Sequence, residues 1–133
     1  MGVFQRIFGI SVTSTPSDEG CASIEEGTVR VDLTRAPELA EPGSALRLES
    51  PDLPDRLMVL HGLDGAYRAY TNHCACSGWR IDPVPGEHKV RCCTMARSTF
   101  DYDGVKLSGP AKGDLTTHPV GRDGDTLVIR PPT

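Results

Sequence analysis

The chain of 133 residues has the length of one domain, which buries an apolar core without disulfide staples. Its 18 acidic and 14 basic residues give a net charge of -4, so no nucleic-acid partner is expected. No apolar run reaches the roughly 18 residues of a transmembrane segment, and the N-terminus lacks the features of a secretory signal. We therefore expect a cytoplasmic protein, in which paired thiols are metal ligands or redox groups more often than structural disulfides.

Residues 1–26 are interpreted as an N-terminal tail. Phe4, Ile7 and Phe8 recur at helical spacing, which predicts a short amphipathic helix. That helix either docks on a partner or a membrane surface, or folds back on its own domain, which a segment of this length favours. Cys21 follows a polar run rich in turn residues, far from the other four thiols, and is interpreted as a thiol outside any ligand set.

From Thr28 onward, short alternating segments separated by turn residues are typical of antiparallel sheets. Tight turns are predicted at residues 63–65 and 102–104, and one helical turn at 37–40. The expected strands cover residues 29–33, 45–48, 56–60, 66–70, 89–92, 99–101 and 126–130. The pattern predicts one all-β domain over residues 27–133.

Four thiols stand in two close groups in the middle of the chain. Cys74 and Cys76 come just after an expected strand, and Cys92 and Cys93 end another. Two close thiol pairs on loops of a rigid sheet indicate one metal or iron-sulfur site. Neighbouring residues of an extended segment project to opposite faces, so the pattern leaves open how Cys92 and Cys93 share this role.

The order of the motifs resembles a Rieske-type [2Fe-2S] ferredoxin domain over about residues 28–131. The resemblance rests on four stretches, which are residues 72–78, 90–101, 108–111 and 115–120. It implies a Rieske-like antiparallel sandwich in which a small subdomain, about residues 71–112, carries two metal-binding cysteine loops. It also implies that Pro110 covers the cluster and that Ser98 hydrogen-bonds the cluster or one of its ligands.

The ligand positions depart from the pattern of this family. Its signature is Cys-x-His, a spacer of about fifteen to seventeen residues, and Cys-x-x-His. The spacer fits, but Cys76 stands at the first histidine position. The second histidine position is Ala96 when Cys93 is taken as the thiolate, and Met95 when Cys92 is taken. Both signature histidines are therefore replaced.

Three states of the site follow from these residues. A [2Fe-2S] cluster would use Cys74, Cys76, Cys93 and a fourth ligand, which is Cys92, His73, His88 or water. A single zinc or iron ion would take four thiolates, and a metal-free site would hold reduced thiols or one disulfide across the loops. The [2Fe-2S] cluster is favoured because thiolates are soft ligands that select iron-sulfur clusters.

The expected function is that of a small soluble electron carrier with a cysteine-rich [2Fe-2S] site. Its partner would be a redox protein, either a reductase or an oxygenase-type enzyme. The alternative is a cluster-free or zinc-binding accessory subunit of a redox enzyme. No catalytic activity of its own is expected, because the sequence has no phosphate-binding glycine loop and no paired nucleophile and base. His118 is interpreted as a packing residue.

Overall fold

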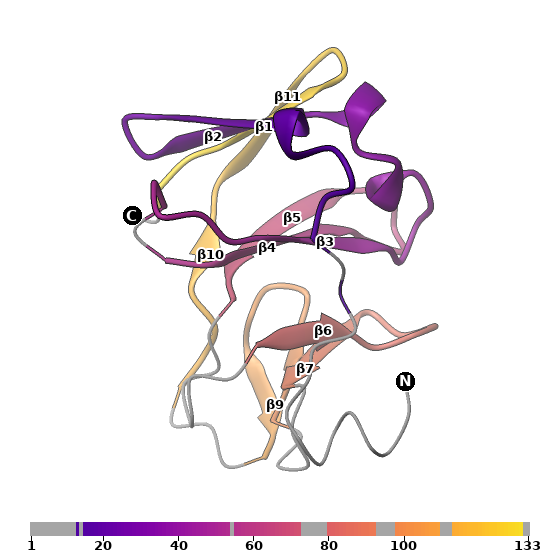
Figure 1. Ribbon diagram of the computed structural model, residues 1–133. Helices are drawn as coiled ribbons and strands as arrows, with labels where there is room; N and C mark the ends of the chain where they lie inside the picture. Colours follow the sequence, from indigo (N-terminus) through magenta and orange to yellow (C-terminus); the bar gives the residue numbers. More distant parts are fainter. Residues whose placement is uncertain are drawn as a thin grey trace.

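A computed structural model of the chain describes residues 13, 15–53, 55–72, 80–92, 98–109 and 113–131. In these parts the chain forms three antiparallel sheets of four strands each, joined by turns and three short 3-10 helices (Figure 1). The all-β prediction is confirmed. The expected N-terminal helix, together with Cys74, Cys76 and Cys93, falls outside the described residues. None of the described helices is long and apolar enough to cross a membrane.

The first sheet brings the two ends of the described chain together in the order β1-β2-β12-β11. Its strands are β1 (Ala22–Glu25), β2 (Thr28–Asp32), β11 (Val120–Asp123) and β12 (Thr126–Ile129). Strand β2 alternates, with Val29 and Val31 buried and Arg30 exposed between them. One face of this sheet is therefore apolar and covers the core, as the period of two predicts.

The second sheet is the middle layer of the molecule (Figure 1). It has the order β10-β5-β4-β3. Its strands are β3 (Ala45–Leu48), β4 (Leu57–His61), β5 (Tyr67–Thr71) and β10 (Thr117–His118). Leu57 and Val59 of β4 belong to the core cluster shared with the first sheet, whereas Met58 and Leu60 belong to a second cluster. A strand that is covered on both faces has apolar residues at successive positions, which explains the sequence of β4.

The third sheet is smaller and lies against the other face of the middle sheet (Figure 1). Its strands, in the order β6-β7-β8-β9, are β6 (Ile81–Pro83), β7 (Lys89–Cys92), β8 (Thr99–Asp101) and β9 (Lys106–Ser108). The second core cluster joins it to β4 and β5, and Phe100 and Ile81 are both fully buried there. Residues 80–92 and 98–109 thus form a compact unit, while the expected bounds of the subdomain, about residues 71–112, stay a prediction.

The connections on the N-terminal side are three 3-10 helices, η1 (Glu19–Cys21), η2 (Leu33–Arg35) and η3 (Pro37–Leu39). The last corresponds to the helical turn predicted at residues 37–40. It begins with Pro37, whose missing N–H costs nothing at a first helical position.

Strand β1 was not expected, since it lies within residues 1–26, which the sequence assigns to the tail. It pairs with β2 through a two-residue turn in which both Glu26 and Gly27 have positive φ, 52° and 79°. This is the conformation of a type I′ hairpin. The strand has only four residues, and half-buried Ala22 and Ile24 give it a weak apolar signal.

The buried faces of the sheets carry the stability of the fold. Leu127 of β12 is 0% exposed in the first core cluster, and Leu107 of β9 is 50% exposed. Leu127→Ala is expected to lower the free energy of unfolding by about 2 to 5 kcal/mol, because it leaves a cavity. The matched Leu107→Ala should change it by about 0.5 kcal/mol or less. Urea unfolding followed by circular dichroism measures both, and equal losses would contradict this assignment of the core.

Candidate functional site at the cysteine loops

Both cysteine loops are anchored on the third sheet. The first loop follows Asn72, just after β5, and returns to the sheet at Ile81 of β6. The second joins β7 to β8, between Cys92 and Ser98. Strands β6 and β7 pair with Ile81 directly opposite Cys92, so one end of each loop lies beside the other. The described ends of the two segments that carry the thiols therefore share one rigid support.

Asn72 closes the first cysteine loop. Its side chain is fully buried, and its Oδ1 accepts a hydrogen bond of 2.7 Å from the backbone N–H of Ile81. Its own backbone N–H donates to the carbonyl of Arg56 at 2.8 Å. Because the N–H of Ile81 is a donor, the Asn72 side-chain atom that it contacts must be the oxygen. This fixes the orientation of the Asn72 amide and leaves its Nδ2 as a donor. Asn72 Nδ2 is buried without a hydrogen-bond partner within the described structure.

The second loop is closed by the backbone. The N–H of Cys92 donates to the carbonyl of Ser98 at 2.9 Å, and Ser98 itself is fully buried. Gly109, in the third stretch of the family resemblance, packs on Ser98 so closely that a Cβ there would clash with Ser98 Cα. Its φ of +97° also lies in the region that only glycine adopts freely. Three separate segments therefore converge at the end of the second loop.

Cys92 is the one predicted ligand that the structure describes. It is 1% exposed and lies in the second core cluster, on the same face of β7 as Val90. This position is compatible with core packing and with ligation from below the loops. The described residues contain no group of three or more His, Cys, Asp or Glu side chains that could hold a metal. The ligand set of Cys74, Cys76, Cys93 and Cys92 therefore stays a prediction.

Cys21 lies elsewhere, buried in the first core cluster at 2% exposure. Burial raises the pKa of its thiol, and the carboxylates of Glu38 and Asp18 act in the same direction. A protonated thiol is a poor metal ligand. These observations agree with the interpretation of Cys21 as a thiol outside the ligand set.

His118 fastens β10 to the strand that leads into the first loop. Its Nδ1 lies 3.1 Å from the carbonyl oxygen of Arg130, and its Nε2 lies 2.9 Å from Thr71 Oγ1. A carbonyl oxygen only accepts, so Nδ1–H donates to it, and Nε2 of the neutral ring accepts from the threonine hydroxyl. Burial lowers the pKa of His118 and favours this neutral form. The contacts agree with the packing role predicted for this residue.

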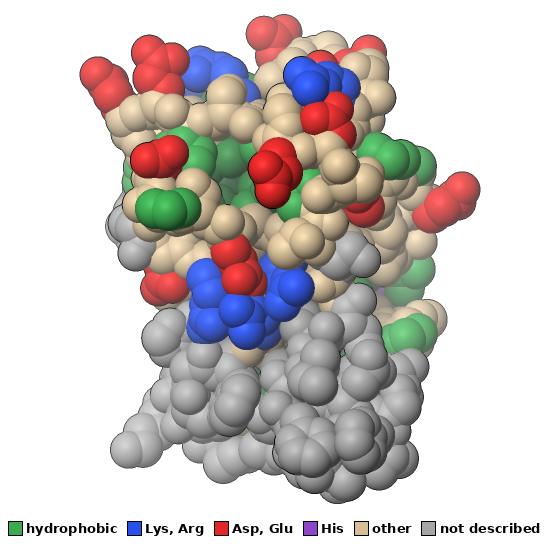
Figure 2. Space-filling view, in the orientation of Figure 1, with side chains coloured by type: hydrophobic (Ala, Val, Ile, Leu, Met, Phe, Trp, Pro, Cys, Tyr) green, Lys and Arg blue, Asp and Glu red, His purple; other side chains and the backbone are tan. Residues whose placement is uncertain are grey.

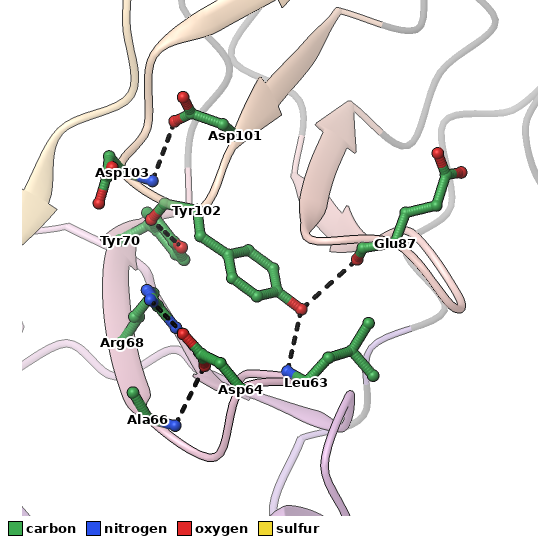
Figure 3. Close-up of polar contacts among 9 residues, drawn as sticks. All are labelled: Leu63, Asp64, Ala66, Arg68, Tyr70, Glu87, Asp101, Tyr102 and Asp103. Atoms are coloured by element: carbon green, nitrogen blue, oxygen red, sulfur yellow. Dashed lines mark hydrogen bonds and ion pairs between the residues drawn. The ribbon is translucent and has the colours of Figure 1, made fainter.

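Tyr102 joins the third sheet to the β4–β5 hairpin, and the sequence analysis attached no role to it (Figure 3). Its hydroxyl accepts from the N–H of Leu63 at 3.2 Å, and the Arg68 guanidinium lies over its ring at 4.7 Å. Arg68 is held by Asp64 through two hydrogen bonds of 2.9 and 2.8 Å. The hydroxyl of buried Tyr70 donates to the Tyr102 carbonyl at 2.6 Å. The third sheet is thereby held firmly against the middle sheet.

The sequence contained a partial signal for this contact. Tyr102 lies in the predicted turn at residues 102–104, two residues after buried Phe100, and Asp64 lies in the predicted turn at 63–65. The two turns are far apart in the chain, so no local pattern shows that they meet.

Comparison with known proteins identifies the fold. No family model and no curated protein sequence matches the chain. It is similar to the ferredoxin of carbazole 1,9a-dioxygenase from Nocardioides aromaticivorans IC177, with a TM-score of 0.59 and 19% identity, covering 71% of this chain and 90% of that one. The plasma membrane Rieske protein PetC3 from Synechocystis PCC 6803 gives a TM-score of 0.55 and 23% identity over 65% and 86% of the two chains.

A larger protein shares the fold over part of its length. A quaternary ammonium Rieske monooxygenase gives a TM-score of 0.56 and 17% identity over 71% of this chain but only 28% of that one. The chain thus spans less than a third of the monooxygenase and most of the two smaller proteins. Likeness at these identities shows the architecture, which is that of a Rieske-type domain.

The close approach of Gly109 to Ser98 gives a test of the loop anchor. Gly109→Ala should lower the free energy of unfolding by about 3 kcal/mol, since it adds a backbone clash to an unfavourable φ. Gly86→Ala is the matched control, because Gly86 has a φ of +73° with open space around it. It should cost about 1 kcal/mol. Similar losses in the two variants, measured by urea unfolding, would show that the third stretch does not pack on the second loop.

The burial of His118 predicts a dependence of stability on pH, because it lowers the pKa of this side chain. The folded-state pKa is lowered, and the unfolded value is about 6.5. Below about pH 6.5 the imidazole is therefore protonated in the unfolded chain but stays neutral in the folded protein. The free energy of unfolding falls as the pH drops below that value. Above about pH 6.5 the contribution of neutral His118 to stability is fully present. Urea midpoints between about pH 5 and 8 should show a shallower acid slope in His118→Gln, and an unchanged slope would contradict the assignment.

Proposed function

We propose that the protein is an electron carrier of the Rieske fold that binds a [2Fe-2S] cluster through thiolates of its two cysteine loops. The proposal rests on the fold, on the thiols that the sequence places in both loops, and on the pairing of Ile81 with Cys92. The ligands would be Cys74, Cys76 and Cys93, with Cys92 or His73 as the fourth. When bound, such a cluster supplies one-electron transfer.

The observation that carries the proposal is the buried amide of Asn72. Its Nδ2 is a donor without a hydrogen-bond partner in the described structure, two residues before Cys74. A buried donor left unpaired costs about 1 to 3 kcal/mol, so proteins rarely keep one unless a partner arrives. Thiolate and sulfide sulfur accept hydrogen bonds from such donors, which tune the reduction potential of iron-sulfur sites. The donor at this position fits a sulfur-rich, negatively charged group.

The surrounding residues would prepare the site for electron transfer. Asn72 and Ser98 fix the ends of the loops, so the ligands need little rearrangement to hold the group. The second core cluster beneath the loops keeps water from that side. Thiolates in place of the two imidazoles add negative charge, which moves the expected potential toward the plant-type value of about -400 mV.

The partner would be a redox protein, a reductase or an oxygenase-type enzyme, and the compartment would be the cytoplasm. The similar ferredoxin from Nocardioides belongs by name to a dioxygenase, which supports a partner of this class. The chain spans the part of the monooxygenase that shares this fold and under a third of the whole. A carrier of this kind would pass electrons to its partner without catalytic activity of its own.

One observation favours the alternative, a cluster-free or zinc-binding accessory subunit of a redox enzyme. Contacts between protein groups close the described ends of both loops, through the side chain of Asn72 and the backbone of Cys92 and Ser98. The fold around the site therefore does not depend on metal for these contacts. Such a subunit would use the same surface to bind its enzyme.

Metal analysis separates the two functions. Protein purified without oxygen should contain about two irons and two sulfides per chain and absorb in the visible range if the cluster is bound. Colourless, metal-free protein would end the carrier proposal in favour of the accessory subunit. One equivalent of zinc would favour the zinc-binding version.

Serine variants identify the thiols that hold the metal. Cys74→Ser and Cys93→Ser should each abolish bound iron, because a hydroxyl is a poor substitute for a thiolate ligand. The control Cys21→Ser should leave the iron content unchanged, because that thiol is buried in the first core cluster. Iron retained in Cys93→Ser and lost in Cys92→Ser would show that Cys92 is the thiolate ligand of the second loop.

A further inference from the structure

A buried contact ties the segment that precedes the first sheet to the third sheet. The hydroxyl and the backbone N–H of Thr13 both donate to Oδ1 of Asp82 in β6, at 2.6 and 3.1 Å. Thr13 is 6% exposed and Asp82 is 1% exposed. A carboxylate is rarely buried this completely unless it is paired, so the contact is a fixed part of the fold. We call it the Thr13–Asp82 anchor.

Asp82 lies on the outer face of the third sheet, which is the face turned away from the second core cluster. Val90 of β7 and Phe100 of β8 belong to that cluster. Side chains alternate along a strand, so their neighbours Arg91 and Thr99 lie on the outer face. Asp82 stands opposite Arg91, and Arg91 stands opposite Thr99. The anchor therefore holds the chain at one edge of a row that crosses the outer face, and the members of this row also make other interactions.

The opposite edge of the third sheet carries exposed apolar side chains. Among the described residues, Val105 and Leu107 are the exposed large hydrophobic ones, at 46% and 50%. The carbonyl of Val105 accepts a hydrogen bond of 2.9 Å from the N–H of Asp101, which places the two residues opposite each other. Asp101 follows Phe100 on β8, so Asp101 and Val105 lie on the outer face. Leu107 lies in the edge strand β9.

Residues 1–12 have a composition that suits this edge. Most of them are apolar, and Arg6 is the only one with a charged side chain. Phe4, Ile7 and Phe8 recur at helical spacing, which would gather them on one side of a helix. Such a segment is stabilised where it covers apolar surface. On the face shown in Figure 2, charged side chains stand between the hydrophobic ones over the first and middle sheets, so the segment gains less there.

The dimensions allow the segment to reach this edge. The third sheet has four strands in the order β6-β7-β8-β9, and neighbouring strands lie about 4.8 Å apart, so its outer face is about 14 Å wide. Twelve residues span about 18 Å as a helix and about 40 Å when extended. A segment that starts from Asp82 on β6 therefore reaches β9 in either form. Because the segment belongs to the same chain, its effective concentration is high and weak apolar contacts suffice to hold it.

We propose that residues 1–12 dock on the outer face of the third sheet, held by the Thr13–Asp82 anchor and packed on Val105 and Leu107. This inference goes beyond the proposed function and does not depend on which group the cysteine loops hold. Of the two expectations for the N-terminal tail, it selects folding back on the domain over docking on a partner or a membrane. The docked segment shields apolar side chains at a sheet edge, which otherwise favour association with other chains.

Limited trypsin digestion of the full chain tests the docking. Trypsin cleaves after Lys and Arg, and the sequence has neither between Arg6 and Arg30. Cleavage after Arg6 reports release of the segment, whereas cleavage after Arg30 in β2 reports unfolding of the first sheet. Mass spectrometry follows both products. Arg6 should be cleaved about tenfold or more slowly in the protein than in a free peptide of residues 1–16, because only the released segment is open to the protease.

A substitution at the anchor gives the first variant. Thr13→Val removes the hydroxyl that donates to Asp82 and leaves the rest of the segment unchanged. The rate of cleavage after Arg6, relative to that after Arg30, should rise about fivefold or more, because a hydrogen bond to a charged group is lost. The matched control Thr13→Ser keeps the hydroxyl and should be cleaved as the wild type is. Circular dichroism checks the fold of each variant.

A second variant weakens the docking without touching the anchor, and it decides alone if Thr13→Val does not fold. Phe4→Ser/Ile7→Ser/Phe8→Ser removes apolar contacts and should raise the same ratio of rates about fivefold or more, whereas Gln5→Ser should leave it unchanged. Hydroxyl-radical oxidation then identifies the covered surface. Leu107 should be oxidised faster in the triple variant than in the wild type, with side chains of the first sheet as the reference.

Three results would overturn the proposal. The first is a ratio of cleavage rates that is unchanged in the folded variants, or cleavage of the wild type after Arg6 as fast as in the free peptide. The second is unchanged oxidation of Leu107 when the segment is released, which would show that another surface holds it. The third is protection of Arg6 that appears only with vesicles of phosphatidylcholine and phosphatidylglycerol, which would indicate docking on a membrane.

Discussion

The fold depends on a middle sheet that is buried on both faces. Leu57 and Val59 of β4 pack against the first sheet, and Met58 and Leu60 pack against the third. Each such side chain contributes about 1.5 to 3 kcal/mol when it leaves water, so one strand stabilises two cores at once. The packing of this strand also holds the third sheet on the middle sheet, where Tyr102 contacts Leu63 and Arg68.

The sequence predicted those elements whose pattern is local. Strand β2 with its alternating Val29 and Val31, the turns at residues 63–65 and 102–104, and the final strand β12 all appear where they were expected. Strand β1 was not predicted because four residues with two half-buried side chains give little periodicity. The contact of Tyr102 with Leu63 was not predicted for another reason. It joins residues that are far apart in the chain, so it produces no periodic pattern in the sequence.

Only the support of the candidate site can be compared with the prediction, and the ligand set stays a prediction. The thiol spacing indicated two loops on a common support, and the structure pairs Ile81 with Cys92 at their bases. The supporting residues were not predictable. The buried amide of Asn72 takes its hydrogen bond from Ile81 on another strand, and an isolated asparagine in a sequence does not indicate such a neighbour. Its electrostatic environment exists only once the sheets are assembled.

The closure of the loops by protein contacts bears on how such a site can change over evolutionary time. Where a metal supplies the only link between two loops, losing one ligand unfolds the region, and selection removes the change. Here Asn72 holds one loop at Ile81, and Ser98 holds the other at Cys92. These two contacts therefore hold the sheets together without any ligand from the residues between them. A scaffold of this kind can accept substitutions in the segments between these contacts one at a time, because each intermediate keeps the same supporting sheets.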